Sequence, residues 1–213
     1  MPLQPFYRYA ECDDRDTGVR MPTASLDAKV HNLTVGELMG RLERFSRGEE
    51  GPEMYPWASR FAMGYPLPAW QRPLVWTEAQ KVRFIQSLWA GVDVGTYMVN
   101  DVYELVNDAQ GDGCHYQLFS EVLLDGQQRL TALEDYFYNR FAVPDAAGVP
   151  RYWQDLPRIE RRRLSSLHFA KATVSSWDER YLRLAYDLRA FGGTPHTEAQ
   201  RASFVKAGGL ESL

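Results

Sequence analysis

The chain has 213 residues, of which 45% are hydrophobic and 13% aromatic, so it can form the packed core of one generous domain. The net charge of −4 argues against a surface that coats nucleic acid without sequence preference, and two isolated cysteines argue against a disulfide framework. The amino terminus shows no signal peptide, and no apolar run approaches the ~20 residues that span a bilayer. We therefore expect a cytoplasmic protein with no membrane partner.

The first half of the chain predicts two helices separated by an extended segment. Residues 1–30 are polar and irregular, and a capping box at Thr34 opens a helix with apolar residues at helical spacing. Three prolines within residues 65–76 favour extended backbone. A second capping box at Thr77 begins a helix that Gly91 can end.

Strands dominate the middle of the chain. Residues 96–106 and 116–124 are typical of the two strands of a hairpin, with its turn at residues 108–113. The second strand leads directly into an Asp125-Gly126 turn. Apolar residues at helical spacing then predict a helix over residues 127–141.

The last third predicts further helices around one strand. Pro157 can start a helix, residues 169–174 are typical of a strand, and a capping box at Ser176 opens a helix that Gly192-Gly193 can end. Thr197 caps a last short helix.

The stretch from Leu123 to Leu133 is the most informative. A buried strand, a glycine turn and a helix N-terminus place unpaired main-chain N–H groups where a phosphate can sit. Gly126 removes the Cβ that would block close approach, and Arg129 adds a permanently charged, fork-shaped donor. The structural alternative is an ordinary Asp-Gly turn with a capped helix, its arginine in a salt bridge.

Three islands of sequence follow one another between residues 66 and 202. The first reads Pro68-x-x-Gln71-Arg72-Pro73-x-x-Trp76, the second Leu124-Asp125-Gly126-Gln127-Gln128-Arg129-Leu130-Thr131, and the third Gly192-Gly193-Thr194-Pro195-His196-Thr197. In this order they resemble the N-terminal domain of GmrSD-type, modification-dependent restriction endonucleases, a group within the ParB/sulfiredoxin-like superfamily.

The resemblance implies a compact α+β fold with a ParB/sulfiredoxin-like mixed β-sheet core packed with helices. It places one DGQQR domain over residues 56–213, behind an N-terminal extension, residues 1–55, with one helix. It also implies a nucleoside triphosphate as ligand, hydrolysed in some members, and a role in driving or gating an attached nuclease. Two departures concern activity. Ala190-Phe191 stand where an asparagine commonly precedes the Gly-Gly pair, and the sequence contains no His-Asn-His arrangement.

With this resemblance, the motif residues receive expected roles. Asp125 would hold Mg²⁺ or order a water, and Gln127 or Gln128 would orient that water. His196 would contact a phosphate or transfer a proton, with a structural histidine as the alternative. The expected nucleotide- and phosphate-binding residues are Gln71, Arg72, Gly126, Arg129, Thr131 and Thr194.

Two further groups of residues have competing interpretations. Trp70 and Trp76 could stack on a base, but tryptophans in a proline-rich turn more often pack in the core. The cluster Arg158, Arg161, Arg162 and Arg163 could contact nucleic acid, but a solvated helix face paired with acidic neighbours is favoured.

The sequence therefore predicts a stand-alone domain that binds a nucleoside triphosphate, with slow hydrolysis left open. It would regulate a restriction, defence or counter-defence system, with a nuclease or another defence protein as partner. DNA binding and homo-oligomer formation are left open. The alternatives are a non-enzymatic interaction or DNA-associated module on the same fold, and a ParB-like nuclease, although an intrinsic nuclease centre is not recognisable.

Overall fold

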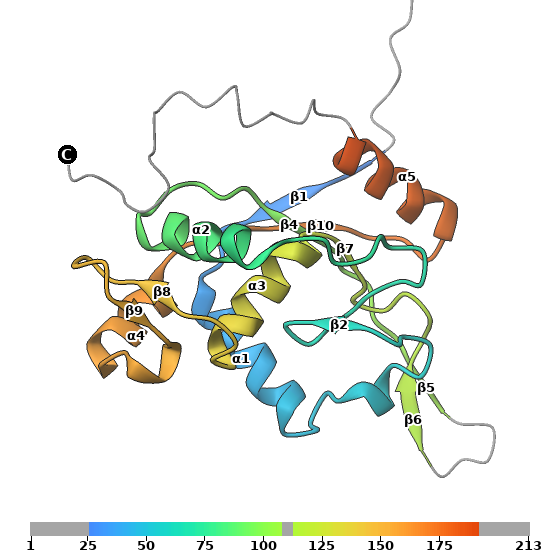
Figure 1. Cartoon of the computed structure of the whole chain (residues 1–213). Helices are drawn as coiled ribbons and strands as arrows, with labels where there is room; N and C mark the ends of the chain where they lie inside the picture. The colour runs from blue at the N-terminus through green and yellow to red at the C-terminus, as the bar shows by residue number, and fades with distance from the viewer. Residues whose placement is uncertain (1–25, 108–112, 192–213) are drawn as a thin grey trace, which may run out of the picture.

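A four-stranded mixed sheet lies at the centre of the computed structural model, which describes residues 26–107 and 113–191 (Figure 1). The strand order is β1-β10-β4-β7. These strands are β1 (Lys29–His31), β10 (Lys171–Val174), β4 (Tyr97–Asn100) and β7 (Leu123–Asp125). The β10–β4 pair is parallel, and the two outer pairs are antiparallel. This mixed sheet with its helices confirms the predicted α+β class.

The described residues form five α-helices, and the capping boxes predicted at Thr34 and Thr77 are present at the starts of the first two. Ahead of the last of these helices, the Ser176 hydroxyl accepts from the Asp178 amide at 3.0 Å. The helices are α1 (Val35–Ser46), α2 (Glu78–Trp89), α3 (Gln127–Phe137), α4 (Arg158–Ser166) and α5 (Glu179–Phe191). In α2, the Thr77 amide donates to Gln80 Oε1 at 2.8 Å. In α1, the Thr34 amide donates to the Glu37 carboxylate. None of the described helices is long and apolar enough to cross a membrane.

Short elements complete the described part of the chain. They are the 3₁₀ turns η1 (Pro52–Met54) and η2 (Trp153–Asp155), and the paired strands β2 (Phe61–Ala62) with β3 (Tyr65–Pro66), β5 (Leu105–Asn107) with β6 (Cys114–Tyr116), and β8 (Val143–Pro144) with β9 (Pro150–Arg151).

The sheet separates two hydrophobic clusters because its residues alternate between its faces. Tyr97 and Leu123 belong to the larger cluster, which α1, α2, α3 and α4 also supply. Their strand neighbours Met98 and Leu124 belong to the smaller cluster, together with apolar residues of α5. Figure 1 shows α5 on one side of the sheet and α1 and α3 on the other. The end of β7 therefore lies between α3 and α5.

The prediction of two unbroken hairpin strands is wrong. Only β5 and β6 pair as a hairpin, while β4 and β7 pair separately within the central sheet. Asn100 ends β4, because its side-chain amide donates to the carbonyls of Phe119 (2.9 Å) and Ser176 (2.8 Å). Phe119 and Glu121 then have positive φ angles of 71° and 49°, which turn the return strand before β7 begins. α3 also ends earlier than predicted, at Phe137.

A buried ion pair links α1 to the turn before β7. Arg41 contacts both carboxylate oxygens of Glu121, at 3.0 and 3.2 Å, and the Tyr55 hydroxyl donates to the same carboxylate at 2.8 Å. The Arg41 guanidinium also lies 3.8 Å from the centre of the Tyr65 ring. These contacts fix Glu121 in its left-handed conformation, which a non-glycine residue adopts only at a cost.

Candidate functional site

A small pocket of about 190 Å³ lies where β7 ends and α3 begins. Four segments of the chain contribute to it: the proline-rich segment, the end of β7, the first turn of α3 and the last turn of α5. Because residues far apart in the sequence meet there, the pocket depends on the whole fold. Its lining residues are Gln71, Arg72, Trp76, Leu124, Asp125, Gly126, Gln127, Gln128, Arg129, Tyr186, Arg189 and Ala190.

Gly126 gives the turn between β7 and α3 its shape. Its φ of +100° lies in the left-handed region, and a Cβ placed there would come within 2.7 Å of Tyr97 Cβ. Glycine is therefore required for close packing against β4, in addition to the open approach to main-chain amides expected from the sequence. The main-chain amides in the first turn of α3 have no intrahelical acceptor, as in any helix. The residues of this turn line the pocket.

Asp125 and two arginines form a compact charged cluster beside these amides. Asp125 Oδ2 accepts from Arg129 Nη2 at 3.1 Å and from Arg189 Nε at 2.8 Å. The three side chains are 24%, 18% and 28% exposed, respectively, so all are largely shielded from water. Burial and the nearby charge of Arg189 lower the pKa of Arg129 despite the opposing effect of Asp125. One carboxylate thus only partly compensates two guanidiniums.

Both arginines also hold the loop that precedes β4. Arg129 Nη1 donates to the Val94 carbonyl at 2.8 Å, and Arg129 Nη2 donates to the Thr96 carbonyl at 3.0 Å. Arg189 Nη2 contacts the same Thr96 carbonyl and, at 2.5 Å, the Thr96 hydroxyl. The simple salt bridge considered for Arg129 is therefore present, but it is one contact among several.

The pocket carries a surplus of positive charge. Its charged lining residues are Arg72, Arg129, Arg189 and Asp125, which give a net charge of +2. The Arg72 side chain has no hydrogen bond or ion pair with another residue in the described ranges, and it is exposed. The whole chain, by contrast, has a net charge of −4. This local concentration of guanidinium groups favours an anionic ligand.

Gln128 is used as a brace between α3 and the proline-rich segment. Its Oε1 accepts from the amides of Val75 and Trp76, both at 3.1 Å, and its Nε2 donates to the Pro73 carbonyl at 3.0 Å. These three bonds occupy both ends of the amide. They give Gln128 a structural role, and its expected orientation of a water stays a prediction.

Gln71 ties the same segment to β7 and Gln127 ties it to α3, and each glutamine keeps one side-chain atom without a partner in the described residues. Gln71 Nε2 donates to the carbonyls of Leu123 and Leu124, each at 2.8 Å, and Gln127 Nε2 donates to the Arg72 carbonyl at 2.6 Å. The two Oε1 atoms are buried and have no partner within residues 26–107 and 113–191. These bonds to carbonyls fix the orientation of both amides.

The remaining predicted site residues are Thr131, Thr194 and His196. Thr131 follows in α3 and does not line the pocket, whereas Thr194 and His196 fall outside the described residues. Arg189 and Thr96 were missed by sequence reasoning. The available signal was that Arg189 lies in the last turn of a predicted helix, just before the third sequence island.

The side chains around Asp125 determine whether the protein can hold the expected Mg²⁺ there. The described part of the chain contains no group of three or more His, Cys, Asp or Glu side chains that could hold a metal ion. Asp125 is already the counter-ion of two guanidiniums, and Mg²⁺ prefers several oxygen ligands in octahedral geometry. The described residues therefore do not fit an ion held by the protein alone. A Mg²⁺ that arrives with a triphosphate stays a prediction.

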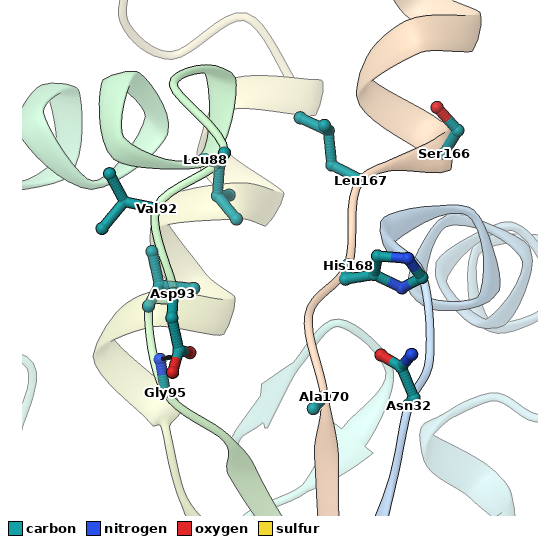
Figure 2. A pocket seen from close by; sticks show the side chains of 11 residues that line it. Asn32, Leu88, Val92, Asp93, Gly95, Ser166, Leu167, His168 and Ala170 are labelled. Carbon is teal, nitrogen blue, oxygen red and sulfur yellow. Dashed lines mark hydrogen bonds between the residues drawn. The ribbon is translucent and has the colours of Figure 1, made fainter.

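A larger cleft of about 380 Å³ lies on another part of the molecule (Figure 2). Figure 2 shows the loop carrying Val92, Asp93 and Gly95 on one wall, with His168 and Asn32 opposite it. His168 is exposed and belongs to no group of metal-ligand side chains among the described residues. The cleft was not predicted from the sequence.

For Trp70, Trp76 and the arginine cluster of α4, the contacts in the structure favour the structural interpretation. Trp76 packs against the larger core cluster and Trp70 against the smaller one. On α4, Arg163 pairs with Glu160 at 3.2 Å, and Arg161 donates to main-chain carbonyls of its own neighbourhood. These contacts agree with core tryptophans and a solvated helix face.

Comparisons with known proteins gave one match. A family model described as "GmrSD restriction endonuclease, N-terminal domain" matches residues 57–197. This range contains the proline-rich segment, the turn at Gly126 and the last turn of α5, and therefore every residue that lines the small pocket. No curated protein and no solved structure matches the chain.

Proposed function

Because the chain belongs to the family of GmrSD restriction endonuclease N-terminal domains, we propose that it binds a nucleoside triphosphate and acts as a regulatory component of a restriction or defence system. The ParB/sulfiredoxin-like fold and a cytoplasmic location are part of this proposal. The small pocket is the binding site, and phosphate oxygens are the groups that it recognises.

The observation that carries the proposal is the pair of guanidiniums at Asp125. Arg129 and Arg189 converge on one carboxylate oxygen at the start of α3, where helix amides have no intrahelical acceptor. Main-chain amides, a helix N-terminus and fork-shaped cations are the donors that phosphate groups require. A neutral ligand would leave the surplus charge of the pocket uncompensated.

The size of the pocket limits how much of a nucleotide it encloses. Pockets for drug-sized ligands usually measure about 300–1,000 Å³, and this one measures about 190 Å³. It therefore holds phosphate groups and leaves the sugar and base outside the described pocket. We assign the remaining phosphates to Arg72, which lines the pocket and is exposed.

Any hydrolysis depends on Gln127 more than on Gln128. A water that attacks the terminal phosphate must be oriented by an acceptor, as a glutamine does in other phosphoryl-transfer enzymes. Gln127 retains an amide oxygen without a partner among the described residues, whereas both ends of the Gln128 amide are occupied. We therefore assign the orienting role to Gln127, and Gln128 keeps the segment in place.

The direct test is a thermal-shift and calorimetry panel with the four ribonucleoside triphosphates, each with and without Mg²⁺. We expect at least one to raise Tm and bind, and Arg129→Ala to abolish binding. Arg183→Ala is the matched control, because Arg183 is an exposed arginine of α5 that contacts Glu179 and the Trp70 ring, neither of which lines the small pocket. Unchanged affinity in Arg129→Ala, or no binding of any triphosphate, would overturn the proposal. A dependence on Mg²⁺ would show that the ion arrives with the nucleotide.

A further inference from the structure

The loop from Gly91 to Thr96 forms part of the larger cleft and contacts a residue of the small pocket. Five of its residues, 91–95, form one wall of the larger cleft, and Figure 2 shows this wall facing Ser166 and His168. From the other side, the carbonyls of Val94 and Thr96 accept hydrogen bonds from Arg129, which lines the small pocket. One side chain of the phosphate site therefore holds a wall of the larger cleft.

The main chain of Val94 has few other attachments, while its side chain packs against the larger core cluster. Within the described residues, the main-chain hydrogen bonds on either side of it belong to Val92, whose amide donates to the Ser87 carbonyl, and to Tyr97, whose amide donates to the Ala170 carbonyl. Between them, the Gly95 amide bonds only within the loop, to Asp93 Oδ1 at 2.8 Å. The contact from Arg129 Nη1 at 2.8 Å is thus the tether of this part of the loop to α3.

Two glycines bracket the tethered residues. Gly91 and Gly95 have φ angles of +72° and +75°, and they enclose Val92, Asp93 and Val94. Glycine changes its backbone conformation at lower cost than other residues, so these two positions can act as hinges. Gly95 also lies directly against the tether, since a Cβ there would be 3.2 Å from Arg129 Nη1. The side chain of Val92 is 56% exposed and therefore resists a movement little, so the side-chain restraint that remains between the two glycines is the packing of Val94 against the core.

We propose that Arg129 couples the two pockets: phosphate bound in the small pocket draws its guanidinium from the Val94 carbonyl, and the wall of the larger cleft moves. This proposal rests on the proposed function, because a phosphate ligand drives the change. The small pocket is then an input and the larger cleft an output of the same domain.

Phosphate oxygens and the Val94 carbonyl compete for the same donors of Arg129, and charge favours the phosphate. A hydrogen bond between a guanidinium and an ionised acceptor is roughly twice as strong as one between neutral groups, and a peptide carbonyl carries only a partial charge. Arg129 is also incompletely compensated, since it shares Asp125 with Arg189. Phosphate oxygens therefore compete well for the donors that now hold Val94. Thr96 keeps its contacts with Arg189, so the movement is confined to the residues between the two glycines.

The test measures the width of the larger cleft directly. Spin labels at Val92→Cys and Ser166→Cys, in the full chain with Cys12→Ser and Cys114→Ser, report the distance between the two walls by double electron–electron resonance. Each of the four ribonucleoside triphosphates is added at saturation, and binding to the labelled protein is measured in parallel by calorimetry. The same measurements are made on Arg129→Lys, which keeps the charge and loses the fork, and on the control Arg183→Lys.

We expect a bound triphosphate to lengthen the mean distance by more than about 2 Å, the size of a loop rearrangement. Without ligand, Arg129→Lys should show a broader distribution of spin-label distances, and added triphosphate should not change it further. Arg183→Lys should behave like the parent. If a triphosphate binds and the distance stays unchanged, the coupling is overturned and the proposed function stands. If no triphosphate binds, both fall, whatever Arg129→Lys does to the loop.

Discussion

Arg189 donates to Asp125 across 64 positions of sequence, at 2.8 Å, and so joins the last turn of α5 to the end of β7. This contact is possible because α5 covers the face of the sheet that carries Leu124, with the end of β7 beneath it. It adds a second guanidinium to a motif that supplies only one. The charge of the small pocket is therefore a property of the fold and not of the DGQQR stretch alone.

Arg189→Ala should weaken triphosphate binding while the protein stays folded. Hydrogen bonds to charged groups contribute about 1.5–3 kcal/mol, so the Kd should rise roughly ten- to a hundredfold. Calorimetry with the triphosphate that gives the largest thermal shift measures this change. Arg183→Ala, on the same helix, should bind as the parent does. Equal affinities of the two variants would show that Arg189 only positions Asp125.

Gly126→Ala should destabilise the fold more than the same change at another left-handed glycine. Gly148 has a φ of +78° and open space around it, so Gly148→Ala should cost about 1–2 kcal/mol from backbone strain alone. Gly126→Ala adds a contact of 2.7 Å with Tyr97 Cβ, which should cost roughly a further 1–3 kcal/mol. Urea unfolding of the two variants measures the difference. Similar losses would mean that β4 and α3 can move apart at this point.

Substitutions of Gln127 and Gln128 should differ in their effects on stability and on phosphate release. Gln128→Ala removes three hydrogen bonds to the proline-rich segment and should cost about 1–2 kcal/mol of unfolding free energy. Gln127→Ala removes one such bond and should cost less, but should abolish any phosphate release that the parent shows. Urea unfolding and a phosphate-release assay at equal nucleotide occupancy test both statements. Phosphate release that survives in Gln127→Ala and fails in Gln128→Ala would reverse the assignment.

Local features of the fold could be predicted from the sequence, and long-range ones could not. The capping boxes at Thr34 and Thr77 predict the starts of α1 and α2 because both partners lie three residues apart. The break after Asn100 could not be predicted, since its side chain bonds to residues 19 and 76 positions away. Val and Tyr on both sides of that break have strand propensity, which explains the expectation of longer strands.

In the candidate site, too, local features could be predicted from the sequence and long-range contacts could not. Asp125, Gly126 and Arg129 could be identified because strand, turn and helix are adjacent in sequence. The choice between Gln127 and Gln128 could not be made, because only the folded proline-rich segment shows which amide it occupies. Arg189 meets Asp125 only after α5 packs on the sheet. Composition and spacing carry no information about such a contact.

The ion pair between Arg41 and Glu121 should make stability depend on pH in acid. Burial alone would raise the pKa of Glu121, but the charge of Arg41 and hydrogen bonds from Arg41 and Tyr55 outweigh it and lower that pKa. A group whose pKa is lower in the folded state stabilises the fold above its unfolded pKa, about 4.3 for glutamate. This contribution is lost as the pH falls below that value, through the folded pKa.

Glu121→Gln removes this titration and therefore provides the comparison. We expect the unfolding free energy of the parent to fall more steeply than that of Glu121→Gln as the pH decreases from about 5 towards 3, measured by urea unfolding. At neutral pH the variant should be the less stable protein, because Arg41 is then buried with only hydrogen-bonding partners that carry no charge. Glu134, whose pKa is raised by burial, is present in both proteins, so its opposite contribution cancels in the difference. Parallel pH profiles of the two proteins would mean that Glu121 keeps its ordinary pKa in the folded state and that Arg41 holds the turn before β7 by geometry alone.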